Sequence, residues 1–329
     1  MWDNKEPIFS VAVAGPTASG KTATAIALGQ MLGGEIISCD SMQIYRGMDI
    51  GTAKPTKEER ACIPHHLIDF VPPDRSYSAA DYAVDAMAAV RDIAGRNRLP
   101  VFCGGTGLYL NAVRTDRHSG MPDVRNEVLR RRLTEEGATE SGRDALYRRL
   151  LSVDPQAAAS THKNNLRRVI RALEIYEETG IPKSEWDRRS GTLNPALNMK
   201  IFLLDFRNRE NLYRRINARV DAMLAEGLME EAEDLYRRGL LAPDSTAAQA
   251  IGYKELIPFI ENRIGKEEAI ENLKTATRRY AKRQLTWFRA IPDAVTLYPD
   301  DGDTLRDGAC LANEIVRIMK EDDRRIAAQ

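Results

Sequence analysis

Cysteine and histidine are scarce in this chain of 329 residues, which contains four of each. The cysteines form no C-x-x-C pair, so the sequence argues against a zinc knuckle or a disulfide framework and suits a reducing compartment. The histidines show no metal-site spacing either. An N-terminal signal segment and a run of about 18 apolar residues are also missing. We therefore expect a soluble, cytoplasmic protein without a membrane span.

The chain also lacks an excess of charge, because Lys+Arg and Asp+Glu both number 48. A surface for a polyanion must therefore come from local clusters. Residues 274–289 contain six basic side chains and no acid, interleaved with Tyr280, Trp287 and Phe288. A basic helix with aromatic side chains suits a phosphate backbone and unstacked bases. Residues 125–132 and 167–171 form a second basic cluster that glutamates partly offset, and an ordinary solvated helix face remains the alternative for both clusters.

The most informative motif of the sequence is a glycine-rich loop at residues 15–22, which matches G-x-x-x-x-G-K-[ST]. It follows an apolar strand expected at residues 9–14 and precedes a helix expected at 23–32. Such a loop directs backbone N–H groups, the Lys21 amine and the Thr22 hydroxyl, a magnesium ligand, at one anion. The motif predicts a phosphate or pyrophosphate site without naming the compound. The residues expected to form it are Gly15, Thr17, Ala18, Ser19, Gly20, Lys21 and Thr22.

The order of expected elements predicts an α/β fold. Strands at residues 9–14, 35–39, 67–71 and 100–103 alternate with helices, which is typical of a parallel sheet covered by helices, here of the P-loop NTPase-like kind. Residues 122–187 show only helical periodicity, and a buried strand returns at 200–206. We expect a catalytic core of residues 1–120 and 196–329 and an all-helical insertion domain of residues 121–195. We also expect a strand at 295–298 and helices at 79–95, 210–226, 229–238, 254–263, 266–289 and 304–320.

Ligands of open α/β sheets bind beyond the carboxyl ends of the strands. Asp40 ends the second expected strand and could accept a proton from a substrate, orient a metal-bound water, or simply cap a turn. The strand at 100–103 ends in Gly104-Gly105-Thr106-Gly107 instead of an acid, which argues against a hydrolase or motor. Thr106 could donate to a leaving pyrophosphate oxygen, although a plain glycine turn is the alternative. Arg219, after the strand at 200–206, could also face a pyrophosphate.

These motifs together resemble the bacterial tRNA dimethylallyltransferases. The resemblance rests on the phosphate loop and, in order along most of the chain, on the segments at 40–55 (DSMQIYRGMDIGTAKP), 65–69, 104–109, 168–174, 249–255 and 282–289. It implies transfer of a dimethylallyl group from dimethylallyl diphosphate to the exocyclic N6 of an adenosine next to the anticodon. The phosphate loop then holds the prenyl diphosphate, with Mg²⁺ on Thr22, and not a nucleoside triphosphate.

The resemblance also implies roles for single residues. Asp40 is the base toward N6, Thr106 lies near the bridging oxygen, and Arg219 faces the pyrophosphate. The partner is the anticodon stem-loop of tRNA, and the protein is expected to act as a monomer. The residues implied to contact tRNA are Asp40, Ser41, Met42, Gln43, Thr106, Arg125, Arg167, Arg168, Arg171, Gln249, Gly252, Tyr253, Lys254, Lys282, Arg283, Gln284, Trp287 and Arg289.

Three other functions fit parts of the sequence. A small-metabolite or nucleoside kinase could use the same loop with Thr22 and Asp40 for phosphoryl transfer. An adenylate prenyltransferase differs only in its acceptor, and the long basic insertion argues against so small a substrate. A non-catalytic tRNA-binding module that retains a vestigial phosphate site is the third.

Overall fold

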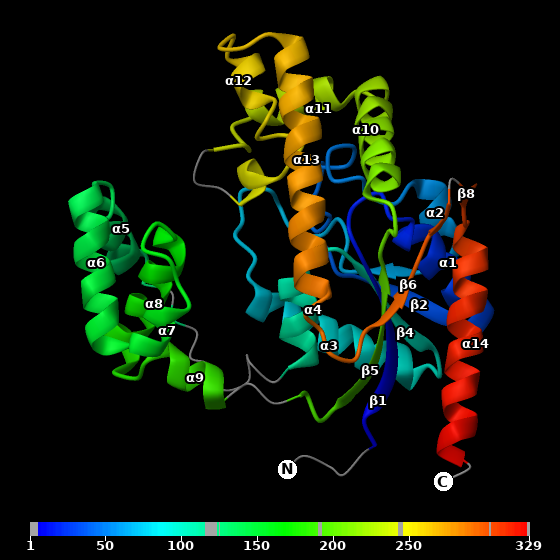
Figure 1. The fold of residues 1–329 in the computed structure, drawn as a ribbon. Helices are drawn as coiled ribbons and strands as arrows, with labels where there is room; N and C mark the ends of the chain where they lie inside the picture. Colours follow the sequence, from blue (N-terminus) through cyan, green and yellow to red (C-terminus); the bar gives the residue numbers. More distant parts are fainter. Residues whose placement is uncertain are drawn as a thin grey trace. The chain divides into compact units, whose positions relative to one another are not determined.

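The computed structural model describes residues 6–115, 124, 126–189, 193–242, 246–302 and 304–327, with side chains as far as residue 322. The chain divides into two compact units (Figure 1). Unit 1 comprises Met1–Val113 and Ala196–Gln329, and unit 2 comprises Arg114–Pro195. Each unit is described by itself.

Unit 1 is built on a six-stranded sheet in which every strand pair is parallel, in the order β3-β2-β4-β1-β5-β6. The expected fold class, a parallel sheet covered by helices, is confirmed. Strand β3 lies at one edge and consists of the two histidines of the chain's HHLID segment. The strands are β1 (Ile8–Ala14), β2 (Gly34–Ser38), β3 (His65–His66), β4 (Leu99–Gly104), β5 (Leu197–Leu204) and β6 (Val295–Leu297).

Alternating side chains of the strands build an apolar core on each face of the sheet. Ala12 and Phe102 pack under helices α3 (Ala79–Gly95) and α4 (Gly107–Arg114). Their neighbours Val11 and Val101 lie on the other face, under α1 (Lys21–Leu32) and α14 (Gly308–Ala327). Figure 1 shows α1 and α14 side by side against the sheet. Because both faces are buried, the strands are apolar almost throughout, as parallel strands require.

A third apolar cluster lies outside the sheet. It joins the segment Ile44, Tyr45 and Met48 to Tyr253 and to the helices that follow β5. Since these residues are fully buried, the loop after β2 is fixed against those helices. The helices are α10 (Arg209–Ala225), α11 (Leu228–Arg237), α12 (Ile257–Ile260) and α13 (Lys266–Phe288), and the short elements α2 (Lys57–Cys62), η1 (Ala247–Gln249), β7 (Asp300–Asp301) and β8 (Thr304–Leu305) complete unit 1.

Unit 2 is helical in its described part, apart from one bridge between Thr115 and Leu193. Its core is made by apolar residues at helical spacing, among them Leu133, Leu146, Leu150 and Leu173. Apolar residues at this spacing form one face of each helix, which is buried in the centre of the unit. The helices are α5 (Glu127–Glu136), α6 (Glu140–Val153), α7 (Pro155–Ala159), α8 (Leu166–Thr179) and α9 (Lys183–Arg189).

Three expected elements are corrected. The strand expected at residues 67–71 is interrupted because Leu67 and Asp69 have φ values of 57° and 60°, outside the extended region. The helix expected at 254–263 is reduced to α12, where Pro258 stands in the first turn and Asn262, with φ of 55°, follows the end. The helix expected at 304–320 begins instead at Gly308, because residues 304–305 form β8, and it continues to Ala327.

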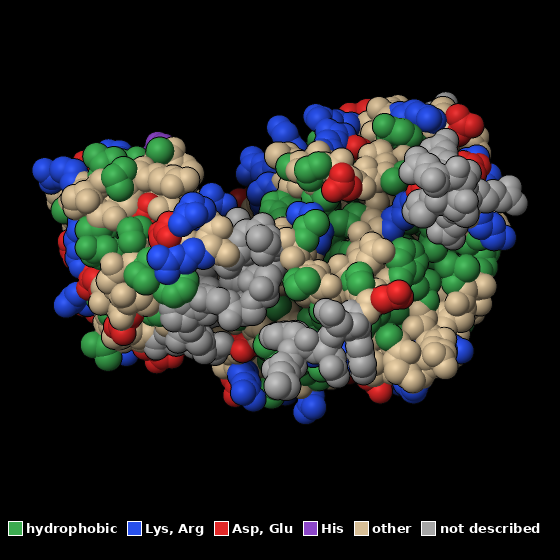
Figure 2. Space-filling model, turned by 90° about the horizontal axis from the view of Figure 1, so that it is seen from below, with side chains coloured by type: hydrophobic (Ala, Val, Ile, Leu, Met, Phe, Trp, Pro, Cys, Tyr) green, Lys and Arg blue, Asp and Glu red, His purple; other side chains and the backbone are tan. Residues whose placement is uncertain are grey.

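The described helices are all too short or too polar to cross a lipid bilayer. On the face drawn in Figure 2, both basic and acidic side chains of the described residues are visible. This agrees with the equal numbers of basic and acidic residues in the sequence.

Candidate active site

The phosphate loop lies where β1 passes into α1. Gly20 takes a left-handed φ of 92° as the cap of α1, a conformation that favours glycine. Ala18, in the same loop, has φ of 62°. These turns place residues 17–23 on the wall of a cleft of about 730 Å³. The first backbone N–H groups of a helix lack helical partners, so this wall suits an anion.

The cleft gathers residues that are far apart in the sequence, all of them in unit 1. The carboxyl ends of β1 and β2, helix α10 and helix α13 each contribute to it. Of the predicted site, the cleft is lined by residues 17–22 and 40–43, Arg219, Gln249, Gly252, Arg283 and Gln284.

Two donors of the phosphate loop are poorly satisfied within the protein. The Oγ of Ser19 is buried and has no hydrogen-bond partner among the described residues. The Nζ of Lys21 donates to the carbonyl of Pro16 at 3.0 Å, and burial lowers the pKa of Lys21 below its usual value. A bound anion would accept from Ser19 and offset the desolvation of Lys21.

Helix α10 brings two arginines, one turn apart, over the loop. The Nε of Arg215 donates to the carbonyl of Ala18 at 2.7 Å, and the described residues offer no partner to its two terminal nitrogens. Arg219 contacts the carbonyl of Ala53 at 3.5 Å. Burial lowers the pKa of both guanidiniums. Arg219 was predicted from sequence, whereas Arg215 was missed, although its spacing of four residues from Arg219 on a helix was visible.

Asp40 follows β2 and faces the cleft. Its Oδ1 accepts the backbone N–H of Met42 at 2.9 Å, which is the turn contact that the sequence left open as an alternative. Its Oδ2 has no partner among the described residues and remains open to a ligand. The negative charge of Asp40 partly opposes the lowering of the pKa of Lys21 and of Arg219. The carboxylate therefore lies within electrostatic reach of the cations that line the phosphate loop.

Thr106 lies in the turn after β4 and contacts the segment that carries Asp40. Its Oγ1 accepts the N–H of Ser41 at 2.9 Å and donates to the Oγ of Ser41 at 3.3 Å. The hydroxyl thus links the turn after β4 to the residue next to Asp40, and Thr106 is not among the described residues that line the cleft. Thr106 also interacts with Tyr280, which lines the cleft, and its predicted role near the bridging oxygen stays a prediction.

Four residues expected to contact tRNA also make contacts within unit 1. Tyr253 is fully buried and donates to Glu231 at 2.7 Å, which excludes a contact between its side chain and RNA. The amides of Gln284 and Gln43 are bonded to backbone groups of neighbouring loops. Arg289 forms two hydrogen bonds with the buried Asp205, at 2.7 and 3.0 Å. Gln43 and Gln284 also line the cleft, and Arg289 is exposed, so the contact of these three residues with tRNA stays a prediction.

The other residues of helix α13 that were predicted to contact tRNA are accessible from outside the protein. Lys282 and Arg283 are exposed, and Trp287 is half-buried. Lys254, in the preceding turn segment, is exposed as well. These side chains combine charge with one aromatic ring, as an RNA-contacting helix does.

In unit 2, Arg167 and Arg168 are exposed at the start of α8 and have no partner among the described residues. Arg171 instead donates to the carbonyl of Val124 at 2.7 Å and to Glu174 at 2.9 Å. Its guanidinium is therefore part of the packing of unit 2. Arg125, also predicted to contact tRNA, lies outside the described residues.

Comparisons with known proteins decide which family this site belongs to. The family model described as IPP transferase matches residues 43–291, and that described as isopentenyl transferase matches residues 10–69. A tRNA dimethylallyltransferase of Geobacillus thermodenitrificans is 52% identical over 85% of this chain and 87% of its own length. Another, of Roseiflexus, is 47% identical over 92% of this chain and 97% of its own. The chain belongs to the IPP transferase family.

Solved structures of the family have the same fold. The full-length tRNA isopentenylpyrophosphate transferase of Bacillus halodurans is 44% identical, covers 98% of this chain and 100% of its own, and has a TM-score of 0.68. A eukaryotic dimethylallyltransferase acting on tRNA is 32% identical over 88% of this chain and 73% of its own, with a TM-score of 0.75. The IPP transferase family therefore accounts for the P-loop-like sheet of unit 1.

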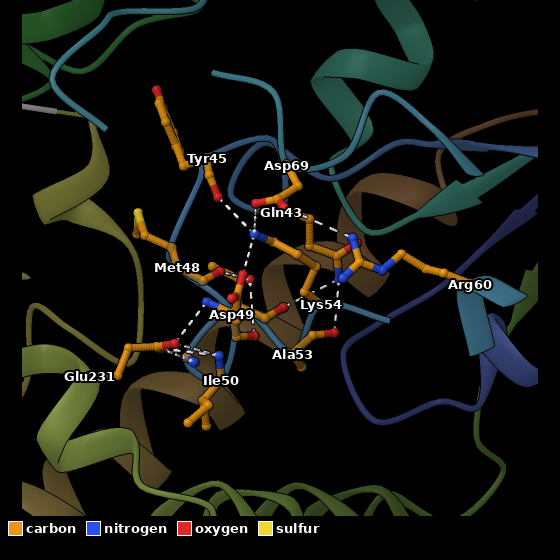
Figure 3. A network of polar contacts seen from close by, with 12 residues as sticks. Gln43, Tyr45, Met48, Asp49, Ile50, Ala53, Lys54, Arg60, Asp69 and Glu231 are labelled. Atoms are coloured by element: carbon orange, nitrogen blue, oxygen red, sulfur yellow. Dashed lines mark hydrogen bonds and ion pairs between the residues drawn. The ribbon is translucent and has the colours of Figure 1, made fainter. Parts of the chain in front are cut away.

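A polar network that the sequence did not reveal holds the loop after β2 of this IPP transferase (Figure 3). Glu231 on α11 accepts the N–H groups of Asp49, Ile50 and Gly51 at 2.9–3.0 Å. The buried Nζ of Lys54 donates to the carbonyl of Tyr45 at 2.8 Å and pairs with Asp49 and Asp69. The sequence held no signal for Glu231, because most of its partners are backbone groups distant in the chain.

Proposed function

We propose that this chain transfers a dimethylallyl group from dimethylallyl diphosphate to the exocyclic N6 of a tRNA adenosine adjacent to the anticodon, with release of diphosphate. Its general reaction, prenyl transfer to a tRNA adenosine, follows from its membership of the IPP transferase family. The phosphate loop supports diphosphate as the leaving group. Its Ser19 hydroxyl is buried without a partner among the described residues, and burial desolvates Lys21 of the same loop.

The chemistry needs this cluster of donors. An adenine amino group is a poor nucleophile because its lone pair is delocalised into the ring. The allylic carbon must therefore become reactive as the C–O bond to diphosphate breaks, and negative charge grows on the departing oxygens. Lys21, Arg215 and Arg219 stabilise that charge more in the transition state than in the substrate, which is the condition for catalysis.

Asp40 accepts the N6 proton in this proposal, directly or through a water, by way of its Oδ2. A D40N variant retains an oxygen for the Met42 N–H and removes the base. We expect kcat to fall on the order of 100-fold or more, within the usual contribution of general base catalysis. Affinity for tRNA, measured by a filter-binding assay, should stay within about twofold. A variant with unchanged kcat would contradict the assignment of the base.

Mg²⁺ fits the donor set of the loop. Thr22 offers one hydroxyl, and the described residues contain no group of three or more His, Cys, Asp or Glu side chains placed to hold a metal ion. Mg²⁺ often binds through one or two protein groups and completes its coordination with substrate phosphates and water. When bound, the ion would neutralise part of the diphosphate charge.

The residues of unit 1 proposed to contact tRNA are Lys254, Lys282, Arg283 and Trp287. In unit 2, considered by itself, they are the exposed Arg167 and Arg168 at the start of α8. The target adenosine is stacked in the anticodon arm and must leave the stack to reach the cleft, as enzymes that act on bases require. Residues 40–42 and Gly252 line the part of the cleft proposed to receive it.

The deciding experiment incubates the protein with labelled dimethylallyl diphosphate and unmodified tRNA, then digests the tRNA to nucleosides. Label in an N6-modified adenosine is the expected result. Three further incubations replace tRNA by AMP, replace the prenyl donor by labelled ATP, or replace Mg²⁺ by a chelator. Transfer to AMP alone would indicate an adenylate prenyltransferase, and turnover of ATP without the prenyl donor would indicate a kinase.

A further inference from the structure

Helix α13 joins the phosphate loop to the turn after β4 through a single side chain. The Oε1 of Gln284 accepts the backbone N–H of Thr17 at 2.9 Å, and its Nε2 donates to the carbonyl of Gly105 at 2.9 Å. Gln284 is 5% exposed. One carboxamide thus provides an acceptor for one loop and a donor for the other.

The turn is shaped to receive this helix. A Cβ atom at Gly105 would lie 2.1 Å from the Nε2 of Gln284. A Cβ atom at Gly107 would lie 2.2 Å from the Trp287 ring, one turn further along the same helix face. Real Cβ atoms do not approach so closely, so a side chain at Gly107 would clash with the Trp287 ring, and one at Gly105 would displace the amide of Gln284.

The contacts continue from the turn to Asp40. Thr106 follows Gly105 and binds both the N–H and the Oγ of Ser41, at 2.9 and 3.3 Å, and Ser41 is the neighbour of Asp40. A short chain of hydrogen bonds therefore runs from the phosphate loop through Gln284 and the turn to the segment that carries the carboxylate.

We propose that Gln284 is a positioning residue for prenyl transfer, whose amide sets the distance between the diphosphate-binding loop and the segment that carries Asp40. This inference rests on the proposed function. The phosphate loop holds the leaving group of the allylic carbon, and Asp40 holds the proton of N6. The distance between the loop and Asp40 therefore decides whether the carbon and the nitrogen meet at reacting distance. A displacement of about 1 Å can lower the rate about 100-fold.

Two perturbations test this positioning from opposite sides. Q284M keeps a similar volume but removes both hydrogen-bonding groups, and G105A keeps the amide but pushes it from its place. The matched control is T286A on the exposed side of α13, where the hydroxyl donates to the carbonyl of Lys282 at 2.9 Å. For each variant, kcat and the KM for tRNA are measured by transfer of labelled prenyl group, and thermal unfolding identifies a variant that does not fold.

We expect Q284M and G105A each to lower kcat at least about tenfold, with the KM for tRNA within about twofold. The double variant should be little worse than either single one, because both remove the same contact. T286A should match the unchanged protein. If the unchanged protein transfers no label, the proposed function fails. If it transfers label while both folded variants retain kcat within about threefold, or raise the KM for tRNA instead, the positioning role is refuted.

Discussion

The Glu231 network yields the sharpest quantitative prediction, because one carboxylate orders a whole turn. Its two oxygens accept the N–H groups of Asp49, Ile50 and Gly51 and the hydroxyl of Tyr253, at 2.7–3.1 Å. Three consecutive backbone donors that converge on one anion form a nest, a concavity that binds anions. The perturbation that removes the charge and keeps the shape is E231Q.

The magnitude follows from the number of donors that lose an acceptor. An amide in place of the carboxylate puts an NH₂ group against at least one backbone N–H, either that of Asp49 or that of Gly51. Hydrogen bonds to a charged group contribute roughly 1.5–3 kcal/mol each. Asp49 lies near solvent, where water replaces part of the loss. We therefore expect E231Q to lower the free energy of unfolding by about 1–2 kcal/mol.

The assay that isolates this effect is amide hydrogen exchange of residues 49–51, combined with urea unfolding. Exchange in E231Q should accelerate about tenfold or more at these amides, because opening of the turn costs less. E230Q is the matched control, since Glu230 is the exposed neighbour on α11 and the charge change is the same. Equal exchange rates in E231Q and E230Q would refute the reasoning.

Two further predictions concern single charges. R215K keeps the positive charge but loses the guanidinium group, which the Ala18 carbonyl orients. We therefore expect kcat/KM for dimethylallyl diphosphate to fall about tenfold, while a filter-binding assay should show unchanged binding of tRNA. The hydrogen bond from Arg96 lowers the pKa of the buried Glu35 from 4.5 to about 2. Because the pKa of Glu35 is lower in the folded protein than in the unfolded chain, its ionisation stabilises the fold at pH values above the ordinary pKa. This stabilisation is lost as the pH falls toward 2. Urea unfolding should therefore show E35Q destabilised by roughly 2–3 kcal/mol at pH 7 and by less at pH 3, and equal losses at both pH values would contradict this.

The elements that sequence predicted correctly are those whose signals are local. Helix α3 has the predicted bounds, because Ser78 and Asp81 form a capping box ahead of an amphipathic run. The segment at residues 67–71 reads as a strand by composition. Its backbone instead follows tertiary contacts: the N–H of Asp69 bonds the carbonyl of Gln43, and its carboxylate pairs with Lys54. Contacts of this kind override local propensity and leave no trace in a single sequence.

The glycine turn between β1 and α1 could be predicted because the spacing of the phosphate loop is a local signal. The burial of residues on α13 could not be read from the basic run alone, because such a run does not say which side of its helix is buried. A signal was nevertheless present for Gln284: Ala281, Leu285 and Phe288 are apolar at helical spacing and place it on the buried side. Tyr253 had no such signal, since its partner Glu231 lies on another helix.

The charges around the cleft indicate why a departing diphosphate suits this site. The whole chain has no net charge, yet the residues lining the cleft include seven basic and four acidic side chains. This local excess attracts an anion that the rest of the surface would not. Burial lowers the pKa of Lys21, Arg215 and Arg219, so each of these cations is poorly solvated and is stabilised most by a nearby negative charge. In the proposed reaction, diphosphate gains negative charge as the allylic bond breaks, and we expect the same three cations to stabilise it more strongly at the transition state than at the start.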